Sequence, residues 1–241
     1  MRTPAETRAI VRTLEEQHPG AQTALHYGSP FQLLVAAVLS AQTTDERVNQ
    51  VTPALFARYP DAAATSRAPI ADVETLVHST GFFAQKARAI VGMAQALVTK
   101  HHGSVPADMD TLVDLPGVGR KTANVVLGHA LGVPGLAVDR HVLRVSNRIG
   151  IAHSEDPEAV ERQLTAALPP RTWTVTSDTL ILHGRRICKP TPLCDRCAVR
   201  LDCEFHRSLA NAAPRAGRAA GAARKVKAPA RTRAAAPRRR H

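Results

Sequence analysis

Apolar residues recur at intervals of three and four along much of this chain, the spacing that places them on one face of an α-helix. Proline or glycine ends several of these patterns, as at Pro19-Gly20 and Pro169-Pro170. The stretch 30–39 is apolar on every side, so we expect a central, buried helix there. Residues 40–45, which follow, are polar and indicate a connection between helices. The pattern predicts helices over residues 6–17, 30–39, 73–77, 87–98, 122–131 and 157–168, with another beginning near residue 141.

Composition favours the same class of fold. Hydrophobic residues make up 44% of the 241 residues but aromatic residues only 3%, so the core is expected to consist mainly of Ala, Val and Leu. A chain of this length can bury a sizeable core in one or two domains, and we expect an all-α fold. We find no leader with a charged start and a cleavage site, and no apolar stretch near the length needed to cross a bilayer. We therefore expect a cytoplasmic protein.

The formal net charge of +12 is unevenly distributed along the chain. Residues 208–241 contain ten Lys or Arg and no acidic residue, and subtracting these ten leaves +2 for residues 1–207. This tail is rich in Ala, Pro, Gly and Arg and lacks apolar periodicity, so we expect it to be disordered. It would add salt-sensitive attraction to nucleic-acid phosphates. The alternative is a solubilising extension without a dedicated role.

Residues 115–119, Leu-Pro-Gly-Val-Gly, stand directly before an apolar run at helical spacing. Glycine adopts backbone angles that other residues resist, so Gly117 and Gly119 predict a tight turn between two helices. Gly132 and Pro134 supply the stop signal of the second helix. A helix start carries N–H groups without partners and a partial positive charge, and it can bind a phosphate whatever the base sequence. The stretch resembles the helix-hairpin-helix motif.

Lys121 lies in the first turn of the second helix of this hairpin, where the helix dipole disfavours an ammonium. A lysine so placed could act as a nucleophile. Asp139 follows one helix and a short loop later, at what reads as another helix start, and could present a carboxylate near Lys121. Taken singly, Lys121 is also explained as a solvated surface lysine and Asp139 as an ordinary N-cap. Their combination with the hairpin favours a catalytic pair.

All four cysteines fall within sixteen residues, whereas the preceding 187 residues contain none. One shared ligand site explains this clustering better than disulfides, which are rare in the cytoplasm, or four unrelated thiols. Four thiolates suit either a zinc ion or a 4Fe–4S cluster, and the spacing alone does not choose between them. A zinc ribbon would more often show a second C-x2-C pair. The candidate ligands are Cys188, Cys194, Cys197 and Cys203.

The sequence LPGVGRKTANVVL at residues 115–127, followed by VDRHVLRVSNR at residues 138–148, resembles the endonuclease III family of DNA glycosylases with lyase activity. The resemblance extends from residue 1 to about residue 206. It implies that Lys121 is the catalytic lysine and Asp139 the catalytic aspartate. Related adenine glycosylases that cut only the base bond typically lack this lysine, so Lys121 favours the bifunctional type.

The resemblance implies two helical domains with a DNA-binding cleft between them. Residues 23–133 would form a helical domain with the helix-hairpin-helix, and residues 1–22 and 134–207 an iron–sulfur cluster domain, followed by the tail. Lys121 and Asp139 would lie on facing walls of the cleft. The implied function is base-excision repair, in which a monomeric, nucleoid-associated enzyme removes oxidised pyrimidines from double-stranded DNA and nicks the abasic site through a lysine Schiff base.

Further residues match positions that contact DNA in the family. Gln42 matches a residue that fills the gap left by an extruded base, and Phe82 lies in a loop inserted opposite it. Phe82 stands where the best-known relatives carry leucine, and packing in the core is its alternative role. The other expected DNA contacts are Gly117, Val118, Gly119, His141 and Lys189.

The family resemblance favours a 4Fe–4S cluster over zinc, although the chain departs from the family's pattern in the first cysteine loop. Five residues separate Cys188 from Cys194 where relatives usually have six, and Pro190 and Pro192 would stiffen the shortened loop. Arg140 is another departure, because the best-known relatives carry a smaller residue between the aspartate and the histidine.

The sequence is also compatible with three other functions. A monofunctional glycosylase of the same fold would excise bases without a lysine adduct, which borohydride trapping detects. A non-catalytic DNA-binding module would use the hairpin and the basic tail alone, and would be unaffected by Lys121→Ala. A zinc-stabilised nuclease would be colourless and would lose activity with chelators.

Overall fold

The computed structural model describes residues 2–212 and shows an all-helical protein, with no strand among these residues. This confirms the predicted all-α class. No helix in this part of the chain is both long and apolar enough to cross a membrane. In chain order the helices are α1 (Pro4–Gln17), α2 (Pro30–Leu39), α3 (Asp45–Arg58), α4 (Ala62–Ser66), α5 (Ile70–Val77), η1 (His78–Thr80), α6 (Phe83–His101), α7 (Met109–Val113), α8 (Arg120–Ala130), α9 (Arg140–Ile149), α10 (Pro157–Ala167), η2 (Pro170–Thr172), α11 (Trp173–Arg186), η3 (Cys194–Arg196) and α12 (Glu204–Ala212).

Polar side chains determine where several helices begin. Thr3 and Glu6 form a capping box at α1, in which the Glu6 N–H donates to the Thr3 hydroxyl at 3.3 Å and the Thr3 N–H donates to Glu6 Oε2 at 2.8 Å. The Ser29 hydroxyl accepts from the Gln32 N–H at 3.2 Å before α2, whereas Gln32 Oε1 accepts from the Gly28 N–H at 2.8 Å. These bonds satisfy N–H groups that a helix start leaves without partners.

The central position expected for the helix at residues 30–39 is confirmed. Eight of the ten residues of α2 are buried, and only Pro30 and Gln32 are partly exposed. Burying one leucine or valine side chain stabilises a fold by about 1.5–3 kcal/mol, so α2 makes a large contribution to the first hydrophobic cluster. The buried residues of that cluster run from Leu25 to Leu127 and come mainly from α2, α3, α5, α6 and α8.

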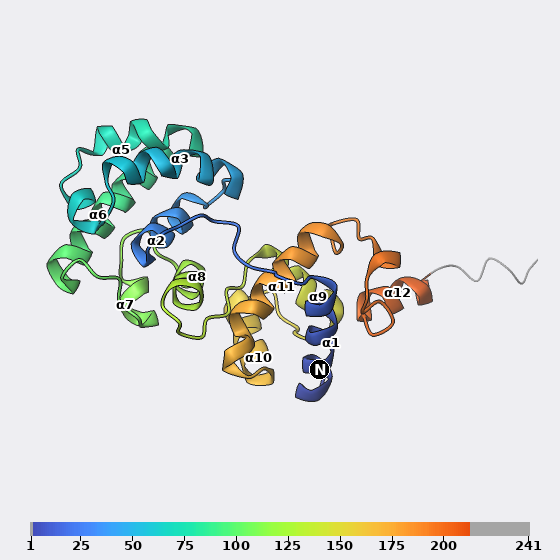
Figure 1. Ribbon diagram of the computed structural model, residues 1–241. Helices are drawn as coiled ribbons and strands as arrows, with labels where there is room; N and C mark the ends of the chain where they lie inside the picture. The colour runs from blue at the N-terminus through green and yellow to red at the C-terminus, as the bar shows by residue number, and fades with distance from the viewer. Residues whose placement is uncertain (1, 213–241) are drawn as a thin grey trace, which may run out of the picture.

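A second hydrophobic cluster combines the first helix with the C-terminal half of the chain. Ile10, Val11 and Leu14 of α1 pack there with buried residues from Leu136 to Cys203. Figure 1 shows the same division, with α2 to α8 in one lobe and α1 beside α9, α10 and α11 in the other. The chain therefore passes between the lobes twice. Domain boundaries after residues 22 and 133 stay a prediction.

Several helices lie where the apolar pattern indicated none. The α3 helix contains Pro53 and only three buried residues, so its periodicity is weak. The α4 and α7 helices have five residues each, which is shorter than the windows in which periodicity is read. The predicted start of the disordered tail at residue 208 is wrong, because α12 continues to Ala212. The rest of that tail, residues 213–241, lies outside the described residues.

Candidate active site

The predicted hairpin joins α7 to α8, and its two glycines have different structural roles. Gly117 has a left-handed backbone with φ of +77°, and a Cβ there would lie 2.8 Å from the Cβ of Ala89, so only glycine fits. Gly119 is the N-cap of α8 with φ of −96°, an extended conformation that any residue adopts. The expectation that both glycines use unusual backbone angles is therefore wrong. Gly119 instead leaves the helix start uncovered, because it has no capping side chain.

The start of α8 offers N–H groups of the kind that bind phosphate. The first backbone hydrogen bond of the helix runs from the Ala123 N–H to the Gly119 carbonyl at 3.0 Å, which leaves the preceding N–H groups of the first turn free. Val118, another expected DNA contact, has a partner for its own N–H within the turn. Its side chain is buried in the first cluster, and its N–H donates to the Leu115 carbonyl at 3.1 Å. Val118 therefore holds the turn in place.

Lys121 and Asp139 lie at two helix starts and line the same cavity. The Lys121 side chain is exposed in the first turn of α8. Asp139 is the N-cap of α9, where its Oδ1 accepts from the N–H groups of His141 at 2.7 Å and Val142 at 2.9 Å. The interpretation of Asp139 as an N-cap is thus correct. Capping uses one carboxylate oxygen, and Oδ2 has no hydrogen-bond partner among residues 2–212.

The shared cavity has a volume of about 250 Å³, and its walls come from both lobes. Two contacts of its lining join residues that are far apart in the sequence. His129 Nε2 lies 3.3 Å from Asp178 Oδ2, and both side chains are mostly buried. Arg185 Nη2 lies 2.8 Å from Asp45 Oδ2. Both contacts run from the first lobe to α11, and neither could be found from spacing in the sequence.

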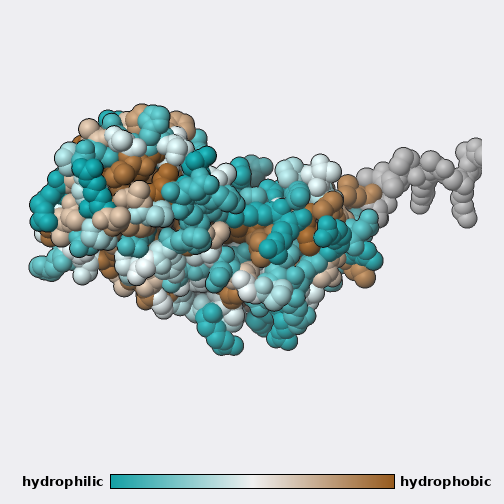
Figure 2. All heavy atoms as spheres, turned by 45° about the horizontal axis from the view of Figure 1, so that its top comes forward, coloured by the Kyte–Doolittle hydropathy of each residue, from teal (hydrophilic) through white to brown (hydrophobic). Residues whose placement is uncertain are grey.

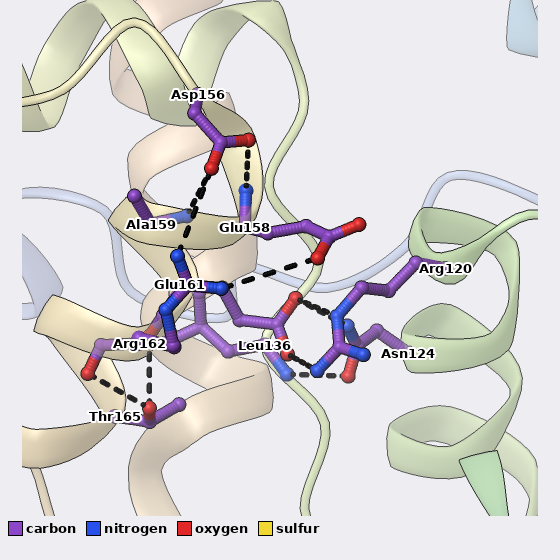
Figure 3. A network of polar contacts seen from close by, with 9 residues as sticks. All are labelled: Arg120, Asn124, Leu136, Asp156, Glu158, Ala159, Glu161, Arg162 and Thr165. Carbon is purple, nitrogen blue, oxygen red and sulfur yellow. Dashed lines mark hydrogen bonds and ion pairs between the residues drawn. The ribbon is translucent and has the colours of Figure 1, made fainter. Parts of the chain in front are cut away.

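A polar network beside the cavity joins α8 to α10 (Figure 3). Glu161 accepts through both carboxylate oxygens from Arg120, at 2.9 Å from Nε and 2.8 Å from Nη2, and also from Asn124 Nδ2 at 3.1 Å. Asn124 Oδ1 accepts from the Leu136 N–H at 3.2 Å. Arg120 and Asn124 lie on the helix that carries Lys121, and Leu136 lies in the segment that leads to α9. The network therefore connects the two walls of the cavity.

His141, one of the expected DNA contacts, is held in one orientation. Its Nδ1 lies 3.1 Å from Arg144 Nη2, and because an arginine can only donate, the proton of the neutral ring is on Nε2. Burial lowers the pKa of His141, and the negative charge of Asp139 partly opposes that effect. The ring is therefore neutral at neutral pH, and its Nε2–H can donate to a ligand.

Gln42 and Phe82 lie at the tips of two neighbouring loops. Both have a left-handed backbone, with φ of 54° and 48°, which is uncommon for residues other than glycine. The loops are joined directly, because the Thr43 hydroxyl donates to the Thr80 carbonyl. Phe82 is 63% exposed, so its alternative role in core packing is wrong. Figure 2 shows one face of the molecule, on which brown, apolar patches interrupt a mainly hydrophilic surface.

The four cysteines lie together at the edge of the second cluster. Cys188 and Cys203 are buried, Cys194 and Cys197 are half-buried, and all four line one small, largely apolar cavity. Burial raises the pKa of Cys197 to about 11 and also raises the pKa of Cys194 and Cys203. Thiolates in these surroundings therefore need a cationic partner such as a metal group. Among residues 2–212, no three His, Cys, Asp or Glu side chains lie close enough together to surround a single metal ion. A metal group is instead favoured by the cavity that the four cysteines share and by their thiol donors.

Two side chains that sequence reasoning missed support the cysteine segment. Arg148 donates to the carbonyls of Lys189 at 2.6 Å and Pro190 at 3.0 Å, and so holds the loop on which the Lys189 side chain is exposed. His183 Nε2 lies 3.7 Å from Cys197 Sγ. Burial lowers the pKa of His183 to about 4, so this ring is neutral. Arg148 ends the stretch 138–148 and His183 lies within a helical pattern, and nothing in the spacing of either residue indicates that it supports the cysteines.

Comparison with known proteins finds close relatives over most of the chain. The profile described as "HhH-GPD superfamily base excision DNA repair protein" matches residues 35–170. The chain is 50% identical to an endonuclease III of Synechocystis sp. over 190 residues, which are 78% of this chain and 87% of that protein. It is 40% identical to the endonuclease III of Escherichia coli (strain K12) over 206 residues, which are 85% of this chain and 98% of that protein.

Two solved structures have a similar fold. A non-covalent endonuclease III–DNA complex superposes with a TM-score of 0.82 at 39% identity, covering 88% of this chain and 100% of that chain. A trapped endonuclease III–DNA covalent intermediate gives the same TM-score and identity, covering 87% of this chain and 100% of that chain.

Proposed function

This chain belongs to the endonuclease III family of the HhH-GPD superfamily of base excision DNA repair proteins, and from this we propose that it removes oxidised pyrimidines from duplex DNA and cleaves the strand at the resulting abasic site. It is a DNA glycosylase with lyase activity. The observation that carries the proposal is that Lys121 and Asp139 line one cavity between the lobes. A 39% identical protein forms a trapped covalent intermediate with DNA, which is the type of adduct that a lysine nucleophile makes.

Lys121 supplies the nucleophile of the proposed reaction. Its neutral amine attacks C1′ of the damaged nucleotide, the glycosidic bond breaks, and the electron pair leaves with the base, which takes up a proton. Asp139, whose Oδ2 is not used in capping, stabilises the positive charge that develops on the sugar and assists the loss of a proton from the amine. The C1′–O4′ bond of the sugar then breaks, O4′ takes up a proton, and a protonated Schiff base forms between C1′ and the lysine nitrogen. Loss of a C2′ proton from this Schiff base expels the 3′ phosphate.

DNA binds across the mouth of the cavity in this proposal. The free N–H groups at the start of α8 contact a phosphate, and Gly117 and Gly119 let the DNA backbone approach closely. Gln42 and Phe82 enter the duplex where the damaged nucleotide has been extruded, which offsets part of the cost of unstacking. His141, through Nε2–H, and the exposed Lys189 make further phosphate contacts.

The four cysteines would hold a 4Fe–4S cluster, with zinc as the alternative. A donor set of four thiols around one cavity fits either group, and membership in the family favours iron and sulfur. The cluster would fix the segment from Cys188 to Cys203 and, with Arg148, the Lys189 loop. Its part in this proposal is structural and DNA-positioning, and no step of the reaction uses it.

Borohydride trapping tests the proposed reaction directly. Duplex DNA that carries an oxidised pyrimidine or an abasic site should become covalently linked to the protein, because borohydride reduces the Schiff base to a stable amine. Lys121→Gln should abolish the adduct while DNA binding survives through the amides of the hairpin. Excision without any adduct would indicate a monofunctional glycosylase. An unchanged adduct yield in Lys121→Gln would assign the chemistry to another amine.

A further inference from the structure

A buried lysine that the proposed mechanism does not use lies beneath the loops of Gln42 and Phe82. Lys86 stands in the first turn of α6 and is 5% exposed. Its Nζ donates at 2.8 Å to each of three oxygens, which belong to the Leu39 carbonyl, the Thr43 hydroxyl and the Thr80 carbonyl.

The hydrogen bonds around Lys86 require three donors from one nitrogen. Two acceptors are carbonyl oxygens, which can only accept, and the Thr43 hydroxyl gives its own hydrogen to the Thr80 carbonyl. Three N–H donors are those of an ammonium group. Leu39 and Thr80 are the last residues of α2 and η1, where carbonyls lack helical partners and carry partial negative charge. Lys86 therefore caps the ends of two helices at once.

Each partner of Lys86 adjoins one of the two loop tips. Thr43 directly follows Gln42, and Thr80 precedes Phe82 by two residues. Phe82 also accepts, through its carbonyl, from the Lys86 N–H at 3.0 Å. A left-handed backbone at a residue other than glycine costs on the order of 1–3 kcal/mol and persists only where the surroundings fix it. A buried ammonium without a carboxylate partner is a second cost at the same place.

We propose that Lys86 is a positioning residue that fixes Gln42 and Phe82 relative to each other, so that the two side chains enter the duplex as one unit. This inference rests on the proposed function, because it requires that these side chains insert into DNA. Lys86 touches no reacting atom. Loss of its bonds leaves only the Thr43 hydroxyl to join the two loops and leaves Lys121 and Asp139 in place, so nucleotide extrusion suffers and the chemistry does not.

Two variants remove the bonds, and each has a matched control. Lys86→Met keeps the length of the side chain and removes all three donors. Thr43→Val keeps the shape and removes the hydroxyl, and with it both the bond from Lys86 and the direct bond to Thr80, so it tests the connection between the loops even where Lys86→Met fails to fold. Thr43→Ser retains the hydroxyl, and Lys100→Met makes the same substitution at an exposed position of α6. Both controls should behave like the unmodified protein, and thermal unfolding monitors the fold of every variant.

The readout compares two single-turnover reactions on otherwise identical duplexes. Excision of thymine glycol, an oxidised pyrimidine, requires a base to be extruded from the duplex, whereas a preformed abasic site has no base to extrude before β-elimination. We expect Lys86→Met and Thr43→Val to lower the excision rate by roughly 10- to 100-fold, as a displacement of about 1 Å can do, and the elimination rate by less than about threefold. A variant that is merely less folded lowers both rates by the same factor.

Gln42→Ala and Phe82→Ala are measured in parallel, so that two kinds of failure are separated. Equal loss of both reactions in Thr43→Val, or loss of neither, overturns the positioning role of Lys86 if the two alanine variants selectively lose excision. If Gln42→Ala and Phe82→Ala leave the ratio of the excision rate to the elimination rate unchanged, the proposed insertion of Gln42 and Phe82 is itself wrong. The inference about Lys86 is then wrong as well.

Discussion

Asp139 performs two tasks, and a suitable substitution separates them. Its Oδ1 caps α9 through two N–H groups, while the carboxylate also lines the cavity with Lys121. Asparagine caps a helix about as well as aspartate but carries no charge. Asp139, which the sequence explains singly as a cap and in combination with Lys121 and the hairpin as a catalytic residue, is therefore expected to be both.

Asp139→Asn should retain the fold and slow base excision by about 10²–10³-fold, because it removes the charge that stabilises the sugar cation. Asp139→Ala removes the cap as well, and should lower the free energy of unfolding by about 1 kcal/mol. Single-turnover excision and thermal unfolding measure the two effects separately. Normal excision by Asp139→Asn would show that the negative charge is not required.

Residues that belong to a local motif could be predicted from the sequence, and residues that act through long-range contacts could not. Lys121 and Asp139 were found because a hairpin and a helix start depend on neighbouring residues. Val118 was an expected DNA contact, but its N–H donates to the Leu115 carbonyl, and the direction of that group depends on how the turn packs against the core. Lys86 and the contact of His129 with Asp178 join positions that no spacing rule connects.

At the scale of helices, the apolar pattern predicted those that bury a continuous face. It indicated α2 most clearly, because nearly every residue of α2 packs in the first cluster. It did not indicate α3, which has few buried residues, and it could not show which helices share a core. The pairing of α1 with α9 to α11 followed from the family resemblance, and in the structure α1 packs in the second hydrophobic cluster.

The network at Glu161 is expected to contribute to stability and to the alignment of the cavity walls. Glu161→Gln keeps the volume but loses the charge that pairs with Arg120, whose side chain is 42% exposed. Because solvent screens that pair, we expect the free energy of unfolding to fall by only about 1–2 kcal/mol. Base excision well below the unfolding temperature should slow by roughly tenfold, since Lys121 and the segment before Asp139 are less firmly connected.

The matched control lies on the same helix. Glu158 is exposed and approaches Arg162 only at 3.9 Å, so Glu158→Gln should change the free energy of unfolding by less than about 0.5 kcal/mol. Chemical denaturation and single-turnover excision provide the two measurements. If Glu161→Gln and Glu158→Gln behave alike, the network does not align the walls.

The cysteine segment should depend on the proposed metal group for folding. Purified protein is expected to be yellow-brown with a broad absorbance at ~400 nm, as four thiolates with iron and sulfur would give. Cys194→Ser should lower the iron content and the cooperativity of unfolding before it affects chemistry, because the metal group closes the local loops. Metal analysis after anaerobic purification checks this. Stoichiometric zinc with negligible iron would show that the four cysteines hold zinc and not a 4Fe–4S cluster.

At the scale of the whole molecule, most of the net positive charge lies in the C-terminal tail and not in the part of the chain that forms the proposed reaction site. Residues 1–207 carry a net charge of +2, so the proposed DNA contacts of the folded part rely on local groups such as the amides of α8 and Lys189. The ten basic residues from Arg215 onward follow α12, which lies in the lobe of the cysteines. The proposed tasks are thus divided, with general attraction to DNA assigned to the tail and recognition of damage to the cavity between the lobes.

Deleting residues 213–241 tests this division, and the deletion point follows from the structure because it leaves α12 intact while removing all ten basic residues. Each phosphate contact made by a lysine or arginine contributes about 0.9 to the slope of log affinity against log salt, so the slope should become shallower by about that amount for every tail residue that reaches DNA. Binding at low salt should weaken, whereas single-turnover excision at saturating protein should stay unchanged, since Lys121 and Asp139 are untouched. A full-length variant with glutamine at the ten positions separates charge from chain length and should match the deletion. An unchanged salt slope in both proteins would mean that the tail does not contact phosphates, which leaves the solubilising extension as its role.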